Sequence, residues 1–408
     1  MAWAVPLLAM PIVSHLFSPG MFGQLAFFLS LVAIGGIAAT GRYELAILIP
    51  RNQKTACAIA VAAVVLAVVL SLLSSLVFFL VYLFAPIRPS SGISAWVWVL
   101  VLPVGVVMTA MSQTLIYFNT RNEHFQTVAR ARAAQAISIT SLQLVTGSIA
   151  SSSIALIASH MVGLVLGVRS LLVRSGPELQ RRLAQIRLAT LLAVARRYSS
   201  FPRYLIVGHL ANTASSQAPV LALAVLYGPA ESGVFAFAER FTVIPSAVIA
   251  GAVGEVYRQK AAQQYSEKGH CLQLFTETKL KLLGAASILA IGTLVAAYAV
   301  IPKLLGSNWG DVAEVAAILS IVVFFQNISS PLSQTVYLAA MYRADLAWQI
   351  FRLVISVLAI ASGFILYDDY KISILFYALA FSLAYSIHSC MQYRAARGSD
   401  RARQNASR

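Results

Sequence analysis

The sequence predicts an all-α, polytopic membrane protein with about 12 transmembrane helices in two six-helix lobes. Hydrophobic residues make up 59% of the chain and charged residues only 11%, whereas a soluble domain has about 45–50% and about 25% of these classes. Several apolar runs exceed the ~18 residues that span a bilayer, and residues 56–86 contain no charged side chain. The runs are continuous and do not alternate, which excludes a membrane β-barrel.

Twelve apolar segments follow one another along the chain. The predicted spans are residues 2–17, 22–40, 55–85, 95–118, 133–149, 152–173, 204–227, 234–256, 280–305, 312–341, 346–366 and 372–392. Basic residues cluster in the loops after the even-numbered spans, whereas the other loops carry only Arg88, Lys303 and Lys371. Because positive charge stays on the cytoplasmic side, this pattern places both termini in the cytoplasm.

The longest connection follows the sixth span and is rich in arginine. Its apolar residues recur at helical spacing, which predicts an amphipathic helix on the inner membrane face. We therefore predict an N-terminal lobe at 1–174, an amphipathic cytoplasmic linker at 175–203, a C-terminal lobe at 204–393 and a basic cytoplasmic tail at 394–408.

An internal repeat supports two related halves. Residues 16–27, LFSPGMFGQLAF, align without a gap with residues 226–237, LYGPAESGVFAF. A shorter repeat places Ser-Gln-Thr at 112–114 in the fourth span and at 333–335 in the tenth. Many secondary transporters consist of duplicated halves with the substrate site between them at mid-bilayer. The repeat therefore points to transport and away from catalysis.

The sequence lacks the signatures of several other function classes. It contains no phosphate-binding glycine loop with lysine and no nucleophile–base pair, and Cys57, Cys271 and Cys390 lack zinc-ligand spacing. We therefore expect no enzymatic activity, no cofactor and no metal. The net charge of +16 lies mostly in alternate loops, and the arginine-rich linker has few aromatic residues. This distribution argues against nucleic-acid binding.

One segment carries a family resemblance. Residues 41–50, GRYELAILIP, resemble a hallmark stretch of bacterial polysaccharide flippases, the Wzx-like members of the MOP exporter superfamily related to MATE transporters. The two repeat segments at 16–27 and 226–237 and Pro-Leu-Ser-Gln at 331–334 are also similar to that family. The resemblance covers nearly the whole chain, and the Arg-Tyr-Glu-Leu-Ala block is its most specific part.

The resemblance implies a V-shaped transporter in the bacterial inner membrane. It would move an undecaprenyl-pyrophosphate-linked oligosaccharide, such as an O-antigen, capsule or exopolysaccharide repeat unit, from the cytoplasmic to the outer leaflet by alternating access. The implied partners are this lipid-linked substrate, membrane lipids, a polysaccharide polymerase and a chain-length regulator. The alternatives are a cation-coupled multidrug exporter of the same superfamily, a membrane glycosyltransferase or polymerase, and a non-transporting scaffold.

Arginines inside predicted spans are candidates for substrate binding, because ionisable residues are costly in a bilayer. Arg240 lies beside Glu239 in the eighth span and Arg352 lies in the eleventh. Arginine can hold a pyrophosphate through paired hydrogen bonds, so we predict that both bind the head group. The alternatives are neutralisation of Arg240 by Glu239 and snorkelling of Arg352 to the interface.

Further candidates lie near the inner ends of the spans. We predict that Arg42 and Glu44 form a cytoplasmic gate or contact the entering head group; the alternative is an interfacial ion pair that fixes the helix end. Arg132 would draw in the anionic head group, although topology alone also explains it. Gln334 would contact the sugar, or else form an interhelical hydrogen bond.

Two titratable residues are candidates for ion coupling. His209 in the seventh span and Glu255 near the end of the eighth span could take up a coupling proton. The alternative for a lone histidine in a membrane helix is a hydrogen-bonded packing role.

Overall fold

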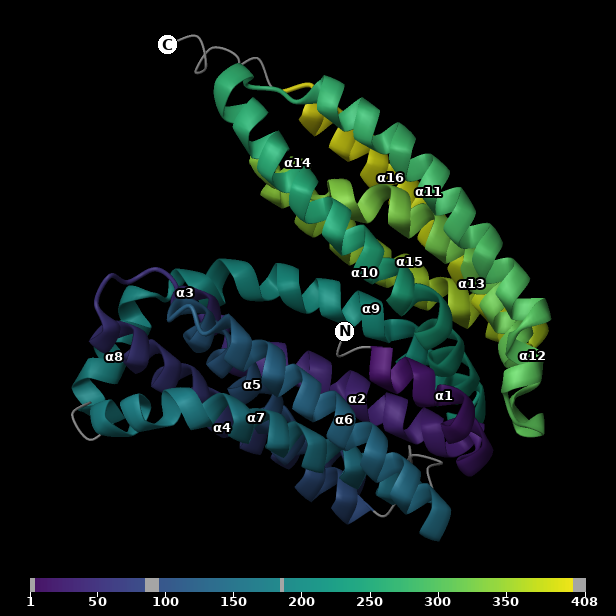
Figure 1. Ribbon diagram of the computed structural model, residues 1–408, viewed down its shortest axis with the longest axis horizontal. Helices are drawn as coiled ribbons and strands as arrows, with labels where there is room; N and C mark the ends of the chain where they lie inside the picture. The colour runs from purple at the N-terminus through teal and green to yellow at the C-terminus, as the bar shows by residue number, and fades with distance from the viewer. Residues whose placement is uncertain (1–3, 85–94, 184–186, 399–408) are drawn as a thin grey trace. The chain divides into compact units, whose positions relative to one another are not determined.

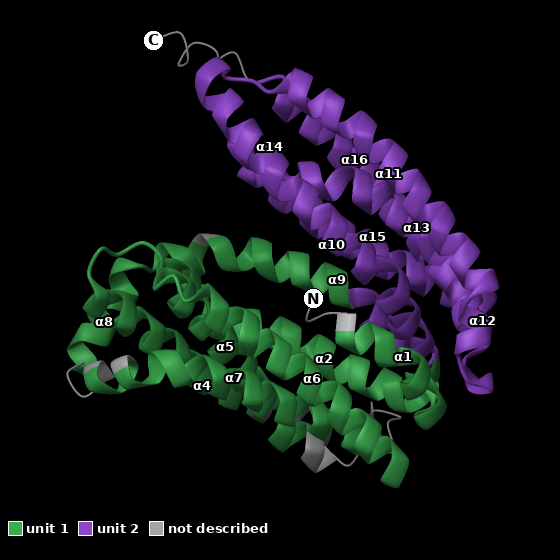
Figure 2. Cartoon of the chain, in the orientation of Figure 1, with its two compact units in different colours: residues 1–217, 228–230 green, residues 218–227, 231–408 purple. Residues whose placement is uncertain are grey.

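The computed structural model describes residues 4–84, 95–183 and 187–398, and every regular element in these ranges is helical (Figure 1). This confirms the predicted all-α class. The chain divides into two compact units, residues 1–217 with 228–230 and residues 218–227 with 231–408 (Figure 2). The lobe and linker borders predicted at 174, 203 and 393 stay a prediction, and residues 399–408 of the predicted tail lie outside the described residues.

The first unit contains the N-terminal helices. They are α1 (Ala4–Leu16), α2 (Pro19–Thr40), α3 (Tyr43–Ala46), α4 (Gln53–Phe84), α5 (Ala95–Arg121), α6 (Phe125–Ile149), α7 (Ser153–Leu183), α8 (Leu188–Arg197), the short η1 (Phe201–Leu205) and most of α9 (Ile206–Leu226). Within this unit α5 packs against α2, α4 and α7, and α6 packs against α7.

The second unit contains the C-terminal helices. They are the end of α9, α10 (Pro229–Lys268), α11 (Leu272–Ala299), α12 (Ile301–Leu304), η2 (Ser307–Trp309), α13 (Val312–Ser329), η3 (Ser330–Leu332), α14 (Gln334–Leu338), α15 (Tyr342–Tyr367) and α16 (Tyr370–Ala396). Here α13 packs against both α11 and α16, and α15 packs against α16.

Nine helical segments among the described residues are long and apolar enough to cross a membrane. They are α2, α4, α5, α7, α10, α11, the Ser307–Leu338 segment, α15 and α16. Helix α1 is apolar but shorter, and the more polar helices α6 and α9 also coincide with predicted spans. The chain is thus a multi-pass membrane protein, and the count of twelve crossings stays a prediction.

The first internal repeat marks the same structural position in both halves. Pro19 is the first residue of α2, and Pro229 is the first residue of α10. Proline is well suited to the first helical position because its fixed φ matches a helix and its missing N–H would have no partner there. The repeated sequence therefore encodes a helix start.

The second repeat occupies different structures in the two halves. Residues 112–114 lie inside the uninterrupted helix α5. The predicted tenth span, 312–341, is instead divided into α13, η3 and α14, with the interruption around Pro331. A proline lacks the N–H needed to continue an α-helical ladder, which explains the break. The predicted span at 312–341 coincides with the Ser307–Leu338 segment that is long enough to cross a membrane, and the structure adds the break inside it.

Within the arginine-rich linker the structure has the end of α7, which extends to Leu183, and the short helix α8. Val194 is buried against a cluster from α3, α4 and α5, and the Tyr43 hydroxyl donates a 2.9 Å hydrogen bond to the carbonyl of Ala195. Arg196 and Arg197 are exposed, as are Leu188 and Leu192. One face of α8 thus packs on the first unit, while its position on the inner membrane face stays a prediction.

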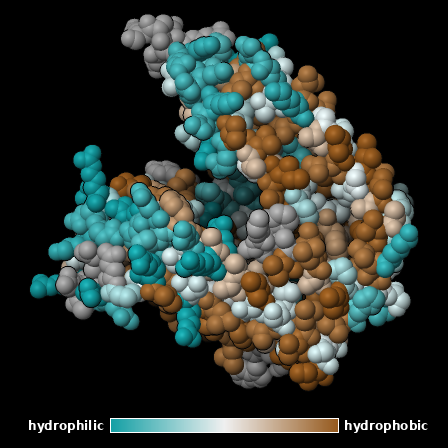
Figure 3. Space-filling model, viewed as in Figure 1, coloured by the Kyte–Doolittle hydropathy of each residue, from teal (hydrophilic) through white to brown (hydrophobic). Residues whose placement is uncertain are grey.

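Hydrophilic residues gather at one end of each unit. In the first unit they cover the region of α3 and α8, and in the second unit they cover the end that carries the C-terminus (Figure 3). Large apolar side chains such as Ile288, Ile365 and Leu366 are exposed elsewhere on the second unit. Exposed aliphatic side chains away from a polar end are expected where helices face lipid.

Close helix contact in the second unit depends on Gly363. A Cβ atom at this position would lie 2.6 Å from the Cα of Ser373 and 2.3 Å from its Oγ. These distances leave no room for a methyl group unless α15 and α16 separate, and small residues permit such close approach between membrane helices.

We expect Gly363→Ala to lower the stability of the second unit by about 1–3 kcal/mol, because overpacking forces the backbones apart. Gly284→Ala in α11 is the matched control, since a Cβ there meets nothing within 4 Å and alanine favours a helix. Thermal unfolding of the detergent-purified protein measures both. Equal melting of Gly363→Ala and the parent protein would contradict the packing argument.

Candidate functional site

The predicted gate residues follow a sharp turn at the end of α2. Gly41 caps this helix with φ 56°, and Arg42 also has a positive φ of 62°. Two consecutive left-handed residues are uncommon, and the second is not glycine, so the backbone there is strained. The turn separates α2 from α3 and places Arg42 and Glu44 on either side of the N-terminus of α3.

Arg42 joins two residues that the sequence assigned to different roles. Its Nη1 atom donates to Glu44 Oε1 at 3.0 Å, and its Nη2 atom lies 2.6 Å from His209 Nδ1 in α9. The Glu44 side chain is fully buried and that of Arg42 is 13% exposed. The structure therefore places the predicted gate and one predicted coupling residue in a single cluster, Arg42–Glu44–His209.

The chemistry of the cluster fixes the tautomer of His209. A guanidinium group can only donate hydrogen bonds, so His209 Nδ1 must accept in this contact. The imidazole is then neutral with its proton on Nε2. Protonation at Nδ1 would turn the acceptor into a donor and break the contact with Arg42.

A second polar pair joins α9 to α2. The Ser30 hydroxyl donates a 2.8 Å hydrogen bond to Gln217 Oε1.

The Arg42–Glu44–His209 cluster contains buried polar atoms without hydrogen-bond partners. Among the described residues, Arg42 Nε and Glu44 Oε2 are two such atoms. Buried polar atoms without partners are rare and are often functional. Arg42 Nε can still donate a hydrogen bond to a water molecule, and Glu44 Oε2 can still accept one.

Helix α15 carries a polar face that is buried inside the second unit. Asp345, Gln349 and Arg352 recur at helical spacing and are each at most 6% exposed. The Asp345 carboxylate accepts hydrogen bonds from the Tyr337 hydroxyl at 2.8 Å and from Gln349 Nε2 at 2.5 Å. Arg352, predicted to bind the head group, is thus part of a packed polar face.

Aromatic rings hold the guanidinium of Arg352. It donates from Nη1 to the Tyr385 hydroxyl at 3.0 Å and lies over the rings of Trp348 and Tyr385 at 4.8 and 5.8 Å. Cation–π contacts of this kind are favourable, above all away from water. The predicted alternative of snorkelling does not describe this side chain, because it is buried and not extended along the surface.

His388 extends the polar face onto α16. Its ring stacks on Trp348 at 3.8 Å, and its Nε2 atom lies 3.9 Å from Asp345 Oδ1. Gln392 Nε2 lies 3.1 Å from His388 Nδ1 and donates to the carbonyl of Ser329 at 2.9 Å, where α13 ends. The interrupted helix is therefore held by side chains of α16.

Arg240 and Glu239 lie side by side in α10 and are both half-buried. Helices α10 and α15 both pack on α16, through the Phe235 and Tyr377 rings and through the Arg352–Tyr385 hydrogen bond. The role of Arg240 and Arg352 toward a substrate stays a prediction.

The other predicted residues lie apart from these clusters. Arg132 in α6 is exposed, and Gln334 is half-buried at the start of α14. Glu255 is exposed on α10 and forms a 2.5 Å ion pair with Arg258. An exposed, paired carboxylate is less suited to ion coupling than a buried one, because solvent already stabilises its charge.

Sequence reasoning missed Asp345 and its partners. The signal was present, because Asp345, Gln349 and Arg352 interrupt an apolar segment at spacings of four and three. Such spacing places side chains on one helix face. Among the described residues, no group of three or more His, Cys, Asp or Glu side chains could hold a metal ion.

Comparison with known proteins adds a family and a fold. A family profile described as polysaccharide biosynthesis protein matches residues 12–314. No curated protein sequence matches the chain.

Several solved structures resemble the whole chain. An inward-facing multidrug resistance MATE family transporter of the MOP superfamily matches with a TM-score of 0.68 and 14% identity over 99% of this chain and 94% of that chain. Lipid II flippase MurJ in an inward closed conformation matches with a TM-score of 0.66 and 13% identity over 99% and 89%. A MOP superfamily transporter from Pyrococcus furiosus matches with a TM-score of 0.52 and 12% identity over 100% and 93%.

At these identities the likeness shows the fold alone. The predicted MATE-like fold is therefore confirmed, and the proteins that share it are described as transporters and a flippase. This agrees with the expectation that the chain is not an enzyme.

We expect Glu44→Gln to destabilise the first unit by about 3–5 kcal/mol, because it leaves Arg42 without its buried counter-charge. Glu255→Gln is the matched control, since its ion pair with Arg258 is exposed and such pairs contribute about 0–1 kcal/mol. Chemical unfolding in detergent measures both. A loss of equal size in the two variants would contradict a structural role for the Arg42–Glu44 pair.

Proposed function

The chain belongs to the polysaccharide biosynthesis protein family, and on this premise we propose that it is a flippase for an undecaprenyl-pyrophosphate-linked oligosaccharide. It moves this lipid from the cytoplasmic to the outer leaflet of a bacterial inner membrane by alternating access. Both termini lie in the cytoplasm, as the loop charges predict. A polysaccharide polymerase and a chain-length regulator act beside it.

The observation that carries this proposal is the presence of arginines within apolar helices of a transporter fold. Arg240 and Arg352 lie in α10 and α15, two segments long enough to cross a membrane. A charge in the hydrocarbon is costly, so its retention points to a function. Arginine suits a pyrophosphate, because its planar N–H donors match phosphate oxygens.

We assign direct head-group binding to Arg240 and support of that site to Arg352. Arg240 is half-buried, so it can become accessible to a substrate. Arg352 is held between aromatic rings and donates a hydrogen bond to the Tyr385 hydroxyl of α16. Arg132 and Gln334 contribute to capture of the head group and to sugar contact.

The Arg42–Glu44–His209 cluster serves as the inner gate. It joins the turn after α2 to the first part of α9 by one short contact that a proton on His209 would break. The charged groups facing His209 there are Arg42 and, behind it, Glu44. Ion coupling by His209 and gating by Arg42 and Glu44 are then one process. Glu255 supports this process least, because it is exposed.

The alternative function is a cation-coupled multidrug exporter. Two observations favour it: a multidrug resistance MATE transporter shares the fold, and the buried carboxylate of Asp345 could attract a cation. The excess of basic residues favours the anionic substrate instead. Proteoliposomes offered a cationic dye and a lipid-linked sugar in parallel distinguish the two functions.

We expect Arg240→Ala to slow flipping of a fluorescent polyprenyl-pyrophosphate oligosaccharide by about tenfold, the change that corresponds to ~1.4 kcal/mol of lost binding to the rate-limiting state. Arg258→Ala in the same helix is the matched control, because Arg258 is exposed and paired with Glu255. Its flipping rate should equal that of the parent protein. Normal flipping by the Arg240→Ala, Arg352→Ala double variant would overturn the site assignment.

We expect His209→Phe to flatten the dependence of the flipping rate on cytoplasmic pH, because phenylalanine can neither accept from Arg42 nor take up a proton. The rate of the parent protein should change only under acidic conditions, because the Arg42 charge 2.6 Å from His209 Nδ1 opposes a second positive charge there. Substitution of His388, which stacks on Trp348, is the histidine control and should leave the pH dependence in place. A pH profile unchanged in His209→Phe would remove the coupling role.

A further inference from the structure

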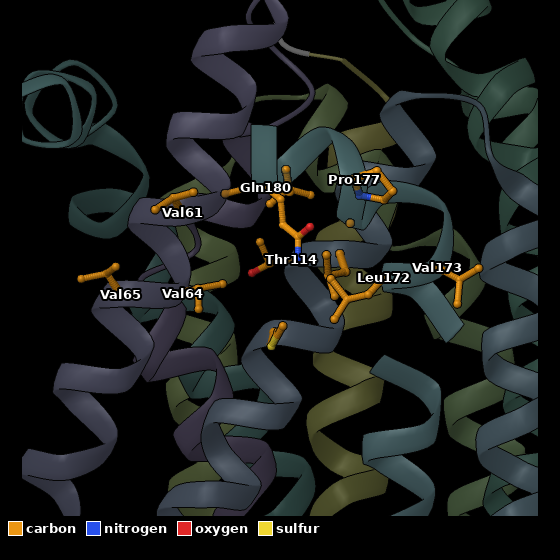
Figure 4. A pocket seen from close by; sticks show the side chains of 13 residues that line it. Val61, Val64, Val65, Thr114, Leu172, Val173, Pro177 and Gln180 are labelled. Atoms are coloured by element: carbon orange, nitrogen blue, oxygen red, sulfur yellow. The ribbon is translucent and has the colours of Figure 1, made fainter. Parts of the chain in front are cut away.

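A pocket opens in the first unit between α4, α5 and α7. Its volume is about 560 Å³, which lies within the range of about 300–1,000 Å³ typical of small-molecule sites. Val61, Val64 and Val65 line one wall, and Leu172, Val173 and Pro177 face them (Figure 4).

Small residues leave the space inside the pocket. Ala60 and Thr114 lie at its floor and are at most 2% exposed. Gly176 lines it from α7, and a Cβ there would meet only the Cβ of Leu172 at 3.9 Å. The Thr114 hydroxyl donates to the carbonyl of Ala110 in its own helix. Apart from the Thr114 hydroxyl and the amide of Gln180, which also points into the pocket (Figure 4), the lining is apolar and suits a hydrocarbon chain better than a sugar.

The mouth of the pocket faces the side of the unit that would contact lipid. Val173 is 75% exposed and Val65 is 50% exposed at its rim. Thr114 lies seven residues before Arg121, the end of α5, which corresponds to about 10 Å along the helix axis. Since the hydrocarbon core is ~30 Å thick, the pocket lies at the depth of the acyl chains of one leaflet.

The charged ends of the same helices are basic. Lys54 is exposed in the first turn of α4, seven residues before Val61 and therefore on the same helix face. Arg181 is exposed on α7 directly after Gln180, which lines the pocket. From residue 169 to residue 197 the sequence has arginines at 169, 174, 181, 182, 187, 196 and 197 but only one acid, Glu178. Basic surface above an aliphatic pocket matches an anionic lipid.

We infer that this pocket is a binding site for an anionic phospholipid of the cytoplasmic leaflet. One acyl chain lies between the valines of α4 and the Leu172–Pro177 wall of α7, and the phosphate contacts Arg181 and Lys54. The proposal is independent of whether the chain transports a lipid-linked sugar or a drug. The bound lipid ties α4 to α7.

The test is native mass spectrometry of the full-length protein with phosphatidylglycerol and phosphatidylcholine as probes. The parent protein should retain one phosphatidylglycerol in preference to phosphatidylcholine. Gly176→Leu fills the pocket and should weaken this binding about tenfold. Loss of burial for only two methylene groups of the lipid acyl chain is enough to cause a change of that size. Gly284→Leu, on a helix position with nothing within 4 Å, should bind as the parent does.

Further variants make the outcome decisive. Val64→Trp fills the pocket from α4 and replaces Gly176→Leu if that variant melts early. Lys54→Ala with Arg181→Ala should remove the preference for phosphatidylglycerol over phosphatidylcholine. Undiminished phosphatidylglycerol binding in both filled variants would overturn the site. Displacement of phosphatidylglycerol by a lower concentration of polyprenyl phosphate would overturn the assigned occupant in favour of a polyprenyl chain.

Discussion

Inside a bilayer, no water is available to hydrogen-bond a peptide group or to solvate a charge, and this constraint governs every part of the chain. The described backbone accordingly satisfies its polar groups in helices. The buried charged side chains Glu44, Asp345 and Arg352 each interact with another charge, a hydroxyl or an aromatic ring. Where the helical ladder is interrupted at Ser329–Pro331, the side chain of Gln392 supplies hydrogen bonds in its place.

The same constraint links structure to function at two clusters. Arg42 shares its charge with Glu44 and a neutral His209, so a single proton can change the contact between the end of α2 and α9. Asp345 is held by Tyr337 and Gln349. In the described structure both clusters contain buried atoms that lack a hydrogen-bond partner, among them Glu44 Oε2 and His388 Nε2. A water molecule, an ion or a substrate group that bonds to such an atom removes the free-energy cost of leaving it buried and unpaired.

The two repeated sequence segments differ in whether they occupy the same local structure in both halves of the chain. Proline begins α2 and α10 alike, because a helix start imposes the same requirement in both places. The Ser-Gln-Thr repeat lies in an unbroken helix in one half and beside the Pro331 break in the other. In the second half the break meets Ser329, His388 and Gln392, a polar environment that accommodates non-helical backbone at this depth.

The sequence by itself determined the all-helical membrane class and the approximate positions of the long apolar helices. These follow from local properties, namely apolar run length and loop charge, together with the resemblance of the Gly41–Pro50 block. Only the tertiary structure decided that His209 contacts Arg42, that Arg352 lies between Trp348 and Tyr385, and that Glu255 is exposed. The His209–Arg42 and Arg352–Tyr385 contacts join residues far apart in the chain. Helical periodicity specifies which face a residue occupies, but not which helix packs against it.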